Sequence, residues 1–132
     1  MSDEIGIVDE LFATGKWSKD NAEAARRANF RCEYRDLDLL KDAHHYRLWH
    51  VDHIIPRKLI EQEGGDPDCL DNLAVACKPC NYDFKWSFDP RTTAGADAKR
   101  EALIRAAKRY IGERRQTCEA EVARMRAIVG LP

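Results

Sequence analysis

The sequence predicts an α+β fold, in which a small antiparallel hairpin is flanked by helices on both sides. Two short apolar runs bounded by proline and glycine lie in the middle of the chain, as is typical of strands. Apolar residues at helical spacing precede these runs, and a longer stretch of the same kind follows them. With 132 residues, the chain has the length of a single domain.

Residues 1–30 are expected to form two helices ahead of the strands. Apolar residues at helical spacing over 3–13 predict a short amphipathic helix. Ser18 is a suitable N-cap for a second helix that ends near residue 29.

Residues 31–90 lose this periodicity and are expected to form the core of the fold. In chain order, the expected elements are a strand over 49–55, a turn over 64–68, a strand over 73–77 and a short helix over 81–86. Pro56 ends the first strand, because proline has no N–H to donate to a ladder. The order of strand, loop, strand and helix is a ββα unit.

Residues 91–132 are expected to form a basic helical extension. Apolar side chains line one face of it, at Leu103, Ile104, Ala107, Tyr110, Ile111, Cys118, Val122, Met125 and Val129. A kink or break is expected near Gly112, since glycine costs about 1 kcal/mol relative to alanine inside a helix. The apolar face is expected to pack against the N-terminal helices. A homodimer formed through this C-terminal helix is the alternative.

The composition is that of an ordinary globular domain, with 44% hydrophobic and 34% charged residues. No apolar run approaches the ~20 residues that span a bilayer, and the first residues lack the basic and apolar regions of a signal peptide. These observations predict a cytoplasmic protein without membrane contact. In that reducing compartment, the five cysteines favour a metal site over disulfides.

Charge is distributed unevenly along the chain, although the net charge is −1. Residues 1–90 hold 12 basic and 18 acidic side chains, whereas residues 91–132 hold 10 basic and 5 acidic ones. A basic tail beside an acidic, metal-binding body would give this asymmetry. A solvated, arginine-rich helix would give it equally well.

Two groups of residues are candidates for chemistry. Asp52 and His53 are adjacent near the end of the first expected strand. A carboxylate suits a hard divalent cation, and an imidazole with a pKa near ~6.5 can deprotonate water at neutral pH. At the end of the second expected strand, Cys77 and Cys80 have the spacing of a zinc or redox pair. Asn81 then offers either an amide oxygen to a metal or an N-cap to the helix.

Together these motifs resemble the HNH endonuclease family over about residues 25–90. The matching segments, in order, are Arg31-Cys32-Glu33-Tyr34, Val51-Asp52-His53-Ile54-Ile55-Pro56, Gly64-Gly65, Asp71-Asn72-Leu73 and Cys77-x-x-Cys80-Asn81 with Lys85. The resemblance implies a ββα-metal fold. It also implies an endonuclease that hydrolyses phosphodiester bonds in nucleic acid, above all in double-stranded DNA.

The resemblance further implies a role for each matching residue. His53 corresponds to the general base, and Asn72 pins the loop between the strands and helps to orient that base. Asp52 and Asn81 correspond to the protein ligands of a catalytic divalent ion, which would be Mg²⁺, Mn²⁺ or a transition metal. Lys85 would contact a phosphate, or is a solvated helix residue.

One position departs from the family pattern. A structural zinc usually takes two Cys-x-x-Cys pairs, and here Arg35 stands where the partner of Cys32 is expected. Arginine cannot bind zinc, because it stays protonated. Cys32, Cys77 and Cys80 therefore form a degenerate site with three alternatives. In the first, a replacement residue supplies the fourth ligand (His44, His45 or Asp36). In the second, zinc binds weakly with water as the fourth ligand, and in the third, zinc is lost. Loss or weak binding is slightly favoured.

His50 lies two residues before Asp52 on the same expected strand. It would reach the substrate phosphate or the metal, or else it is a surface histidine. Two other functions stand beside the nuclease. One is a ββα module that binds nucleic acid without cutting it, and the other is a zinc-type interaction domain with the C-terminal helix as its partner surface.

Overall fold

The computed structural model describes residues 4–132. Residues 1–3, on which part of the signal-peptide argument depends, lie outside this range. Within the described range, none of the helices combines the length and the hydropathy that a membrane crossing requires.

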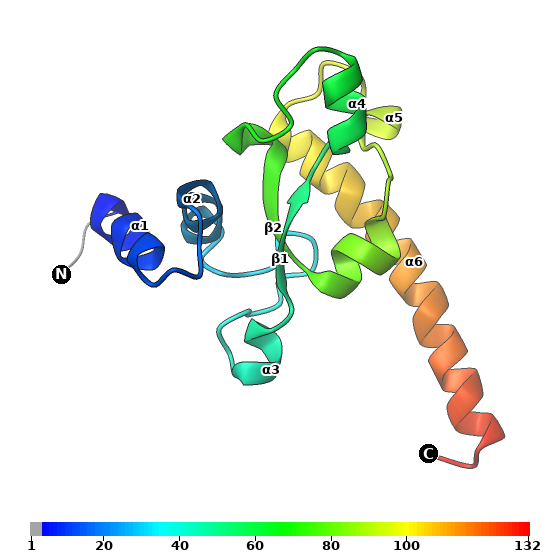
Figure 1. Ribbon diagram of the computed structural model, residues 1–132. Coiled ribbons are helices and arrows are strands. Elements are labelled where there is room, and N and C mark those ends of the chain that lie inside the picture. Colours follow the sequence, from blue (N-terminus) through cyan, green and yellow to red (C-terminus); the bar gives the residue numbers. More distant parts are fainter. Residues whose placement is uncertain (1–3) are drawn as a thin grey trace.

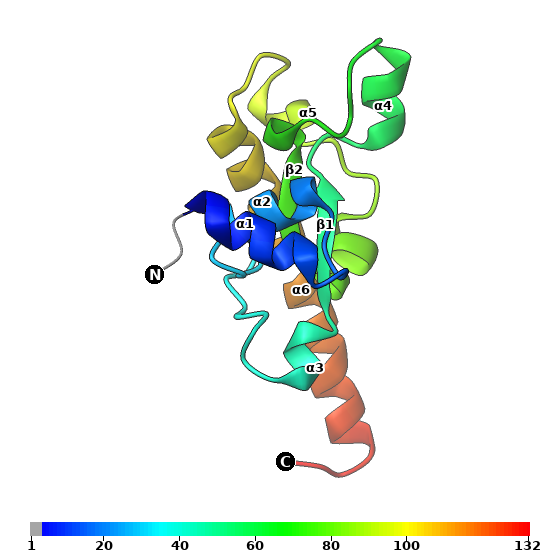
Figure 2. The same ribbon diagram turned by 60° about the vertical axis from the view of Figure 1, so that its left-hand side comes forward.

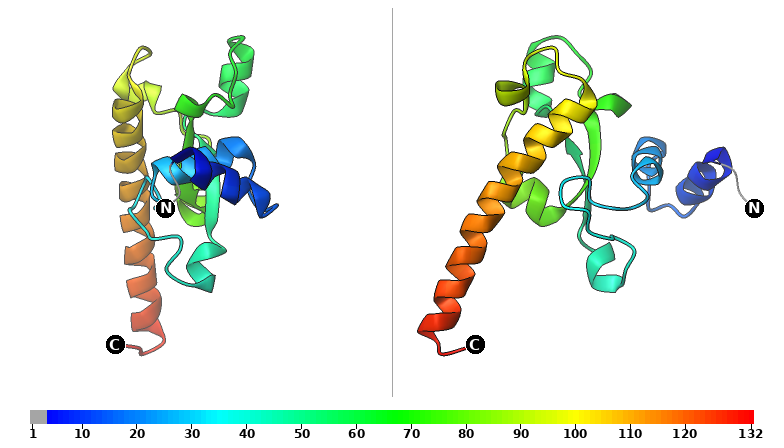
Figure 3. Two further views of the ribbon diagram at one scale, coloured as in Figure 1. Left: turned by 90° about the vertical axis from the view of Figure 1, so that its left-hand side faces the viewer. Right: turned by 180° about the vertical axis from the view of Figure 1, so that it is seen from behind.

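The centre of the molecule is an antiparallel hairpin of β1 (Trp49–His53) and β2 (Leu73–Cys77) (Figure 1). The remaining elements are α1 (Glu4–Ala13), α2 (Lys19–Arg27), α3 (Ala43–Tyr46), α4 (Arg57–Gln62), η1 (Leu70–Asn72), η2 (Pro79–Lys85), α5 (Arg91–Ala94) and α6 (Arg100–Ile128). Helices α1 and α2 lie on one side of the hairpin, and η2 and α6 lie on the other (Figures 1 and 3). The predicted α+β class is confirmed.

The two N-terminal helices form as the sequence predicts. Ser18 caps α2, because its hydroxyl accepts a hydrogen bond from the backbone N–H of Asn21 at 3.1 Å. Small buried alanines on α2 let that helix pack closely against β2 (Figure 2). Trp17, which precedes α2, stacks on Trp49 of β1 with ring centroids 4.0 Å apart.

The hairpin has the predicted second strand and a shorter first strand. All five residues of β2 are buried, which fits a strand covered on both faces. Strand β1 ends at His53 rather than at the predicted Ile55. The reason is a bend, in which Ile54 donates to the Asn72 carbonyl and Ile55 donates to the Asn72 side chain. The connection expected as a loop and turn also contains α4 and η1.

The short helix after β2 is η2, which begins two residues earlier than predicted. It is of the π type, and one of its i→i+5 hydrogen bonds joins Trp86 N–H to the Asn81 carbonyl at 3.0 Å. Trp86 follows with a φ of 49°, a left-handed backbone conformation that is strained for a bulky residue. This helix carries both Asn81 and Lys85 toward the end of β1.

Helix α6 runs unbroken through Gly112, so the predicted kink or break there is wrong. Leu103, Ala107 and Ile111, which lead up to Gly112 along one face, are buried, and this packing outweighs the small propensity cost of one glycine. The chief contacts of α6 are with η2 and α5, not with the N-terminal helices as predicted.

The distal half of α6 extends away from the rest of the molecule (Figure 3). Its apolar side chains, among them Val122, Met125 and Val129, are exposed. A homodimer through this helix therefore stays a prediction.

Candidate active site and cysteine cluster

Asp52 is a buried residue of the candidate active site, and two buried side chains, Tyr34 and Lys85, hold its carboxylate. Its Oδ2 accepts a hydrogen bond from the Tyr34 hydroxyl at 2.6 Å and lies 3.0 Å from the ammonium of Lys85. Burial raises the pKa of Asp52, an effect that Lys85 and the Tyr34 hydrogen bond oppose. Burial also raises the pKa of Tyr34, and the neighbouring Asp52 carboxylate adds to this rise. Tyr34 therefore remains a hydrogen-bond donor.

Lys85 is not positioned to contact a phosphate. Its side chain is completely buried, and its ammonium also donates to the carbonyl of His53 at 3.2 Å. The interpretation of Lys85 as a substrate contact thus does not fit the structure. Helical spacing places it one turn beyond Asn81, and its contacts with the Asp52 carboxylate and the His53 carbonyl of β1 hold the side chain inward.

Asn81 is oriented by His50, which comes from the neighbouring strand. The Asn81 amide Nδ2 donates to His50 Nδ1, and His50 Nε2 lies 2.8 Å from the hydroxyl of Tyr82. Burial lowers the pKa of His50, and the nearby ammonium of Lys78 lowers it further. Both ring nitrogens of His50 already have protein partners, so its predicted contact with substrate stays a prediction.

His53 stands at the end of β1 with a carboxylate and a guanidinium beside it. Its Nε2 lies 2.8 Å from Oδ1 of Asp68 and 3.4 Å from Nη2 of Arg57. The same Asp68 oxygen accepts from Arg57 at 2.6 Å. Hydrogen bonds from His53 and then Arg57 hold the pKa of Asp68 below its ordinary range.

Asn72 is a buried amide that ties together two parts of the connection between the strands. Its Oδ1 accepts from the N–H of Ile55 at 2.9 Å, and its Nδ2 donates to the carbonyls of Ile55 at 3.1 Å and Pro67 at 3.0 Å. Three hydrogen bonds from one buried side chain fix this loop in a single arrangement. The Asn72 side chain therefore holds the loop between the strands by hydrogen bonds, as predicted. Its contribution to catalysis remains a prediction.

Asp52, His53 and Asn81 meet in one pocket of about 250 Å³. The other residues that line it are Pro56, Arg57, Tyr82, Trp86 and Ser87. Among the described residues, none donates to Oδ1 of Asp52 or to Oδ1 of Asn81. Two oxygen atoms from two elements thus remain free to act as ligands. A carboxylate and an amide oxygen, with water in the remaining positions, fit Mg²⁺ or a similar divalent ion.

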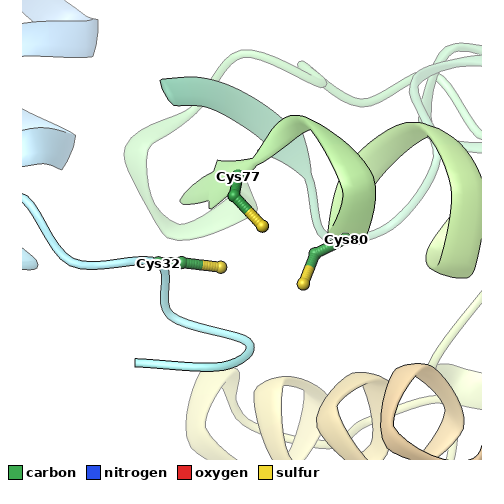
Figure 4. Close-up of side chains that lie close together, drawn as sticks. All are labelled: Cys32, Cys77 and Cys80. Carbon is green, nitrogen blue, oxygen red and sulfur yellow. The ribbon is translucent and has the colours of Figure 1, made fainter. Parts of the chain in front are cut away.

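A second cluster is formed by Cys32, Cys77 and Cys80. They come from the loop after α2, the end of β2 and the start of η2, and their sulfur atoms point toward one another (Figure 4). All three are buried, and their Sγ atoms lie within 4.8 Å of one another. Hydrogen bonds from the other two thiols hold the pKa of Cys77 well below its ordinary range, and the Arg35 guanidinium lowers it further.

The cysteine cluster fits part of a zinc site. Thiolates around a tetrahedral zinc lie about 3.8 Å apart, given Zn–S bonds of about 2.3 Å. In residues 4–132, no fourth cysteine, histidine or carboxylate joins the three sulfur atoms. The proposed replacement ligands His45 and Asp36 instead pair with Asp42 and Arg31. Arg35 is exposed and offers no ligand.

Three residues of the site were not found by sequence reasoning: Tyr34, Arg57 and Asp68. Tyr34 belongs to a quoted motif, but its contact with Asp52 spans 18 positions of sequence. Arg57 lies four residues after His53, at the start of α4, and the bend between them brings the two side chains together. Asp68 lies in the turn cluster predicted over 64–68, where an aspartate is ordinary turn chemistry.

Comparison with known proteins identifies the part of the chain that carries this site. The family model for HNH endonuclease matches residues 38–83, about a third of the chain. This range contains His53, Asn72 and Asn81, and it leaves out Cys32 and Lys85. No curated protein and no solved structure shows significant similarity to the chain. The central segment of this chain, residues 38–83, is therefore similar to the HNH endonuclease family.

Proposed function

We propose that the protein is a metal-dependent endonuclease that hydrolyses phosphodiester bonds in double-stranded DNA. The observation that carries this proposal is the convergence of Asp52, His53 and Asn81 on one pocket. A base and two oxygen ligands in a single concave site are the parts that metal-assisted hydrolysis needs. The match to the HNH endonuclease family supports the same reaction class.

His53 is the general base in this proposal. Its Nε2 is occupied by Asp68, so Nδ1 carries the lone pair that accepts a proton from water. The water oxygen forms a bond to phosphorus as the bond from phosphorus to the 3′ oxygen breaks. The 3′ oxygen leaves with the bonding electrons and takes up a proton from solvent water, so the products are a 5′ phosphate and a 3′ hydroxyl.

Asp52 and Asn81 would hold the divalent ion through their free Oδ1 atoms. When bound, the ion stabilises charge that develops on the phosphate and on the leaving oxygen. Tyr34 and Lys85 keep the Asp52 carboxylate in place from below, while His50 keeps the Asn81 amide turned so that its oxygen is free. The two ligands are thus preorganised by contacts outside the pocket.

Arg57 is the cationic side chain in the pocket lining and is the proposed phosphate contact in place of Lys85. It is half-exposed, and a guanidinium can bind two phosphate oxygens at once. The basic residues of α6 would add attraction for the DNA backbone that does not depend on sequence. The exposed Trp86 at the pocket rim offers a flat surface to a nucleobase.

A plasmid-nicking assay tests this function. Purified protein should nick supercoiled plasmid in the presence of Mg²⁺ or Mn²⁺, and a chelator should stop the reaction. Salt-dependent binding to duplex DNA without cleavage would favour the non-cleaving module instead. Neither cleavage nor binding would favour the interaction domain.

We also infer that a second copy of the chain covers the distal half of α6. Cys118, Val122, Met125 and Val129 are spaced by four, three and four residues, which is the pattern of a two-helix seam. In antiparallel pairing, Glu119 of one copy would lie near Arg126 of the other, so that opposite charges flank the seam. Such a dimer would carry two pockets, and a monomer would carry one.

A further inference from the structure

The loop between α4 and η1 carries Asp68, whose carboxylate contacts two side chains of the pocket. Its Oδ1 lies 2.8 Å from Nε2 of His53 and 2.6 Å from Nη2 of Arg57. We propose that Asp68 is a positioning residue for cleavage, which holds His53 in the Nε2–H tautomer and thereby makes Nδ1 the basic nitrogen. This inference rests on the proposed role of His53 as the general base.

The chemistry of the two groups fixes the direction of their hydrogen bond. A neutral imidazole has one nitrogen that donates and one that accepts, whereas an ionised carboxylate only accepts. The pKa of Asp68 is held low by its partners, so the carboxylate is ionised at neutral pH. Nε2 of His53 must therefore carry the proton, and the lone pair is on Nδ1. Without Asp68, either tautomer would be available and the ring could rotate.

Asp68 is itself held by the folded loop, although its side chain is half-exposed. Its backbone N–H donates to Oδ1 of Asp66 at 2.9 Å, which closes a tight turn. The carbonyl of the preceding Pro67 accepts from the buried amide of Asn72 at 3.0 Å. Since Asn72 also binds the backbone of Ile55, it sets the distance between the Asp68 turn and the end of β1.

Arg57 completes the arrangement by balancing charge. A lone carboxylate beside the pocket would repel an approaching phosphate. Arg57 contacts Asp68 directly and is paired on its other side with Glu61 at 3.5 Å. The guanidinium is thus kept at the pocket, where it offsets one of the two negative charges of Asp68 and Glu61.

Nuclear magnetic resonance of the full chain tests the tautomer without any need for catalysis. Histidine-selective ¹⁵N labelling with two-bond ¹H–¹⁵N correlation distinguishes Nε2–H from Nδ1–H, and loss of a signal in His53→Gln assigns His53. The wild-type protein should show the Nε2–H tautomer, and Asp68→Ala should show both tautomers. Asp68→Asn, whose amide oxygen also accepts, should restore the Nε2–H form. An Nδ1–H tautomer in the wild type, or no change in Asp68→Ala, would overturn the proposal.

Cleavage kinetics supply the second measurement. Asp68→Ala should lower kcat by about 10- to 100-fold, the usual effect of removing a partner that orients a site residue, with little change in KM for duplex DNA. Asp68→Asn should recover most of the loss. Glu61→Gln, which removes a carboxylate that contacts Arg57 but not His53, is the matched control and should retain the wild-type tautomer. A wild-type kcat in Asp68→Ala would contradict the proposal. Absence of cleavage in every protein, the wild type included, would count against the proposed nuclease function. In that case the tautomer measurement alone would decide whether Asp68 positions His53.

Discussion

The ammonium of Lys85 lies 3.0 Å from Oδ2 of Asp52, and both groups are buried beneath the candidate active site. This ion pair joins η2 to β1 at the residue proposed to hold the metal. Taking two charges out of water is costly, and their attraction offsets that cost only while both partners are present. The pair therefore links the stability of the fold to the geometry of the site.

Lys85→Met should destabilise the protein by about 3–5 kcal/mol, the usual cost of leaving one charge of a buried pair alone. The free energy of unfolding from urea titration measures this change. Lys58→Met is the matched control, because Lys58 is exposed on α4, and it should fall within about 0.5 kcal/mol of the wild type. Equal stability of the two variants would show that the ion pair adds nothing to the fold.

His53→Ala should reduce cleavage by about 10²- to 10⁴-fold, the range that a positioned general base contributes. DNA affinity and melting temperature should change little, because the side chain is partly exposed and acts in the chemical step. Plasmid nicking and fluorescence anisotropy measure the two effects separately. His44→Ala, on exposed α3, is the control that should keep wild-type activity. If His53→Ala cut at a near-normal rate, the base would have to be sought elsewhere.

Asn81→Ala should raise the divalent-ion concentration needed for half-maximal cleavage and also lower the maximal rate. Asp52→Asn should do the same, and it is preferable to alanine because it keeps a partner for Tyr34 and Lys85. The measurement is a Mg²⁺ or Mn²⁺ titration of the nicking rate. An unchanged midpoint in either variant would remove that residue from the set of ligands.

The cysteine cluster predicts a gain of metal binding in Arg35→Cys. Cys32, Cys77 and Cys80 already lie within 4.8 Å of one another, so a fourth thiolate at position 35 could complete a tetrahedral site. The variant should bind one zinc per chain and lose thermal stability when a chelator is added, whereas the wild type should carry well under one zinc. Elemental analysis and melting curves measure both. Stoichiometric, chelator-sensitive zinc in the wild type would point to a replacement ligand instead.

The proposed dimer is tested by Val122→Glu, which places a charge in the apolar seam of α6. Sedimentation equilibrium should give a dimer for the wild type and a monomer for the variant. Ala123→Glu adds the same charge one position away from the seam and should leave the dimer intact. A monomeric wild-type protein at micromolar concentration would exclude this surface as a dimer interface.

Local sequence signals account for most of the secondary structure. The bounds of β2, the Ser18 cap and the ββα order follow from apolar runs, turn residues and capping chemistry, which act over a few positions. Two incorrect predictions, a break near Gly112 and a first strand that extends to Ile55, concern positions where tertiary contacts decide the structure. Gly112 does not interrupt α6, because the packing of Ile111 and the buried residues before it holds the helix up to that point. Strand β1 ends early because Asn72 bends the chain after His53.

The sequence by itself determined which residues are chemically suited to the site, since the motif that contains Asp52, His53 and Asn81 can be read from order and spacing. Only the tertiary structure decided what each of them contacts. Lys85 pairs with Asp52 rather than facing solvent, and Asp68 contacts His53 across 15 positions of sequence. The physical reason is that spacing specifies a residue's place on its own helix or strand. Its hydrogen-bond partner is set by how η2 and the α4–η1 connection pack against the end of β1.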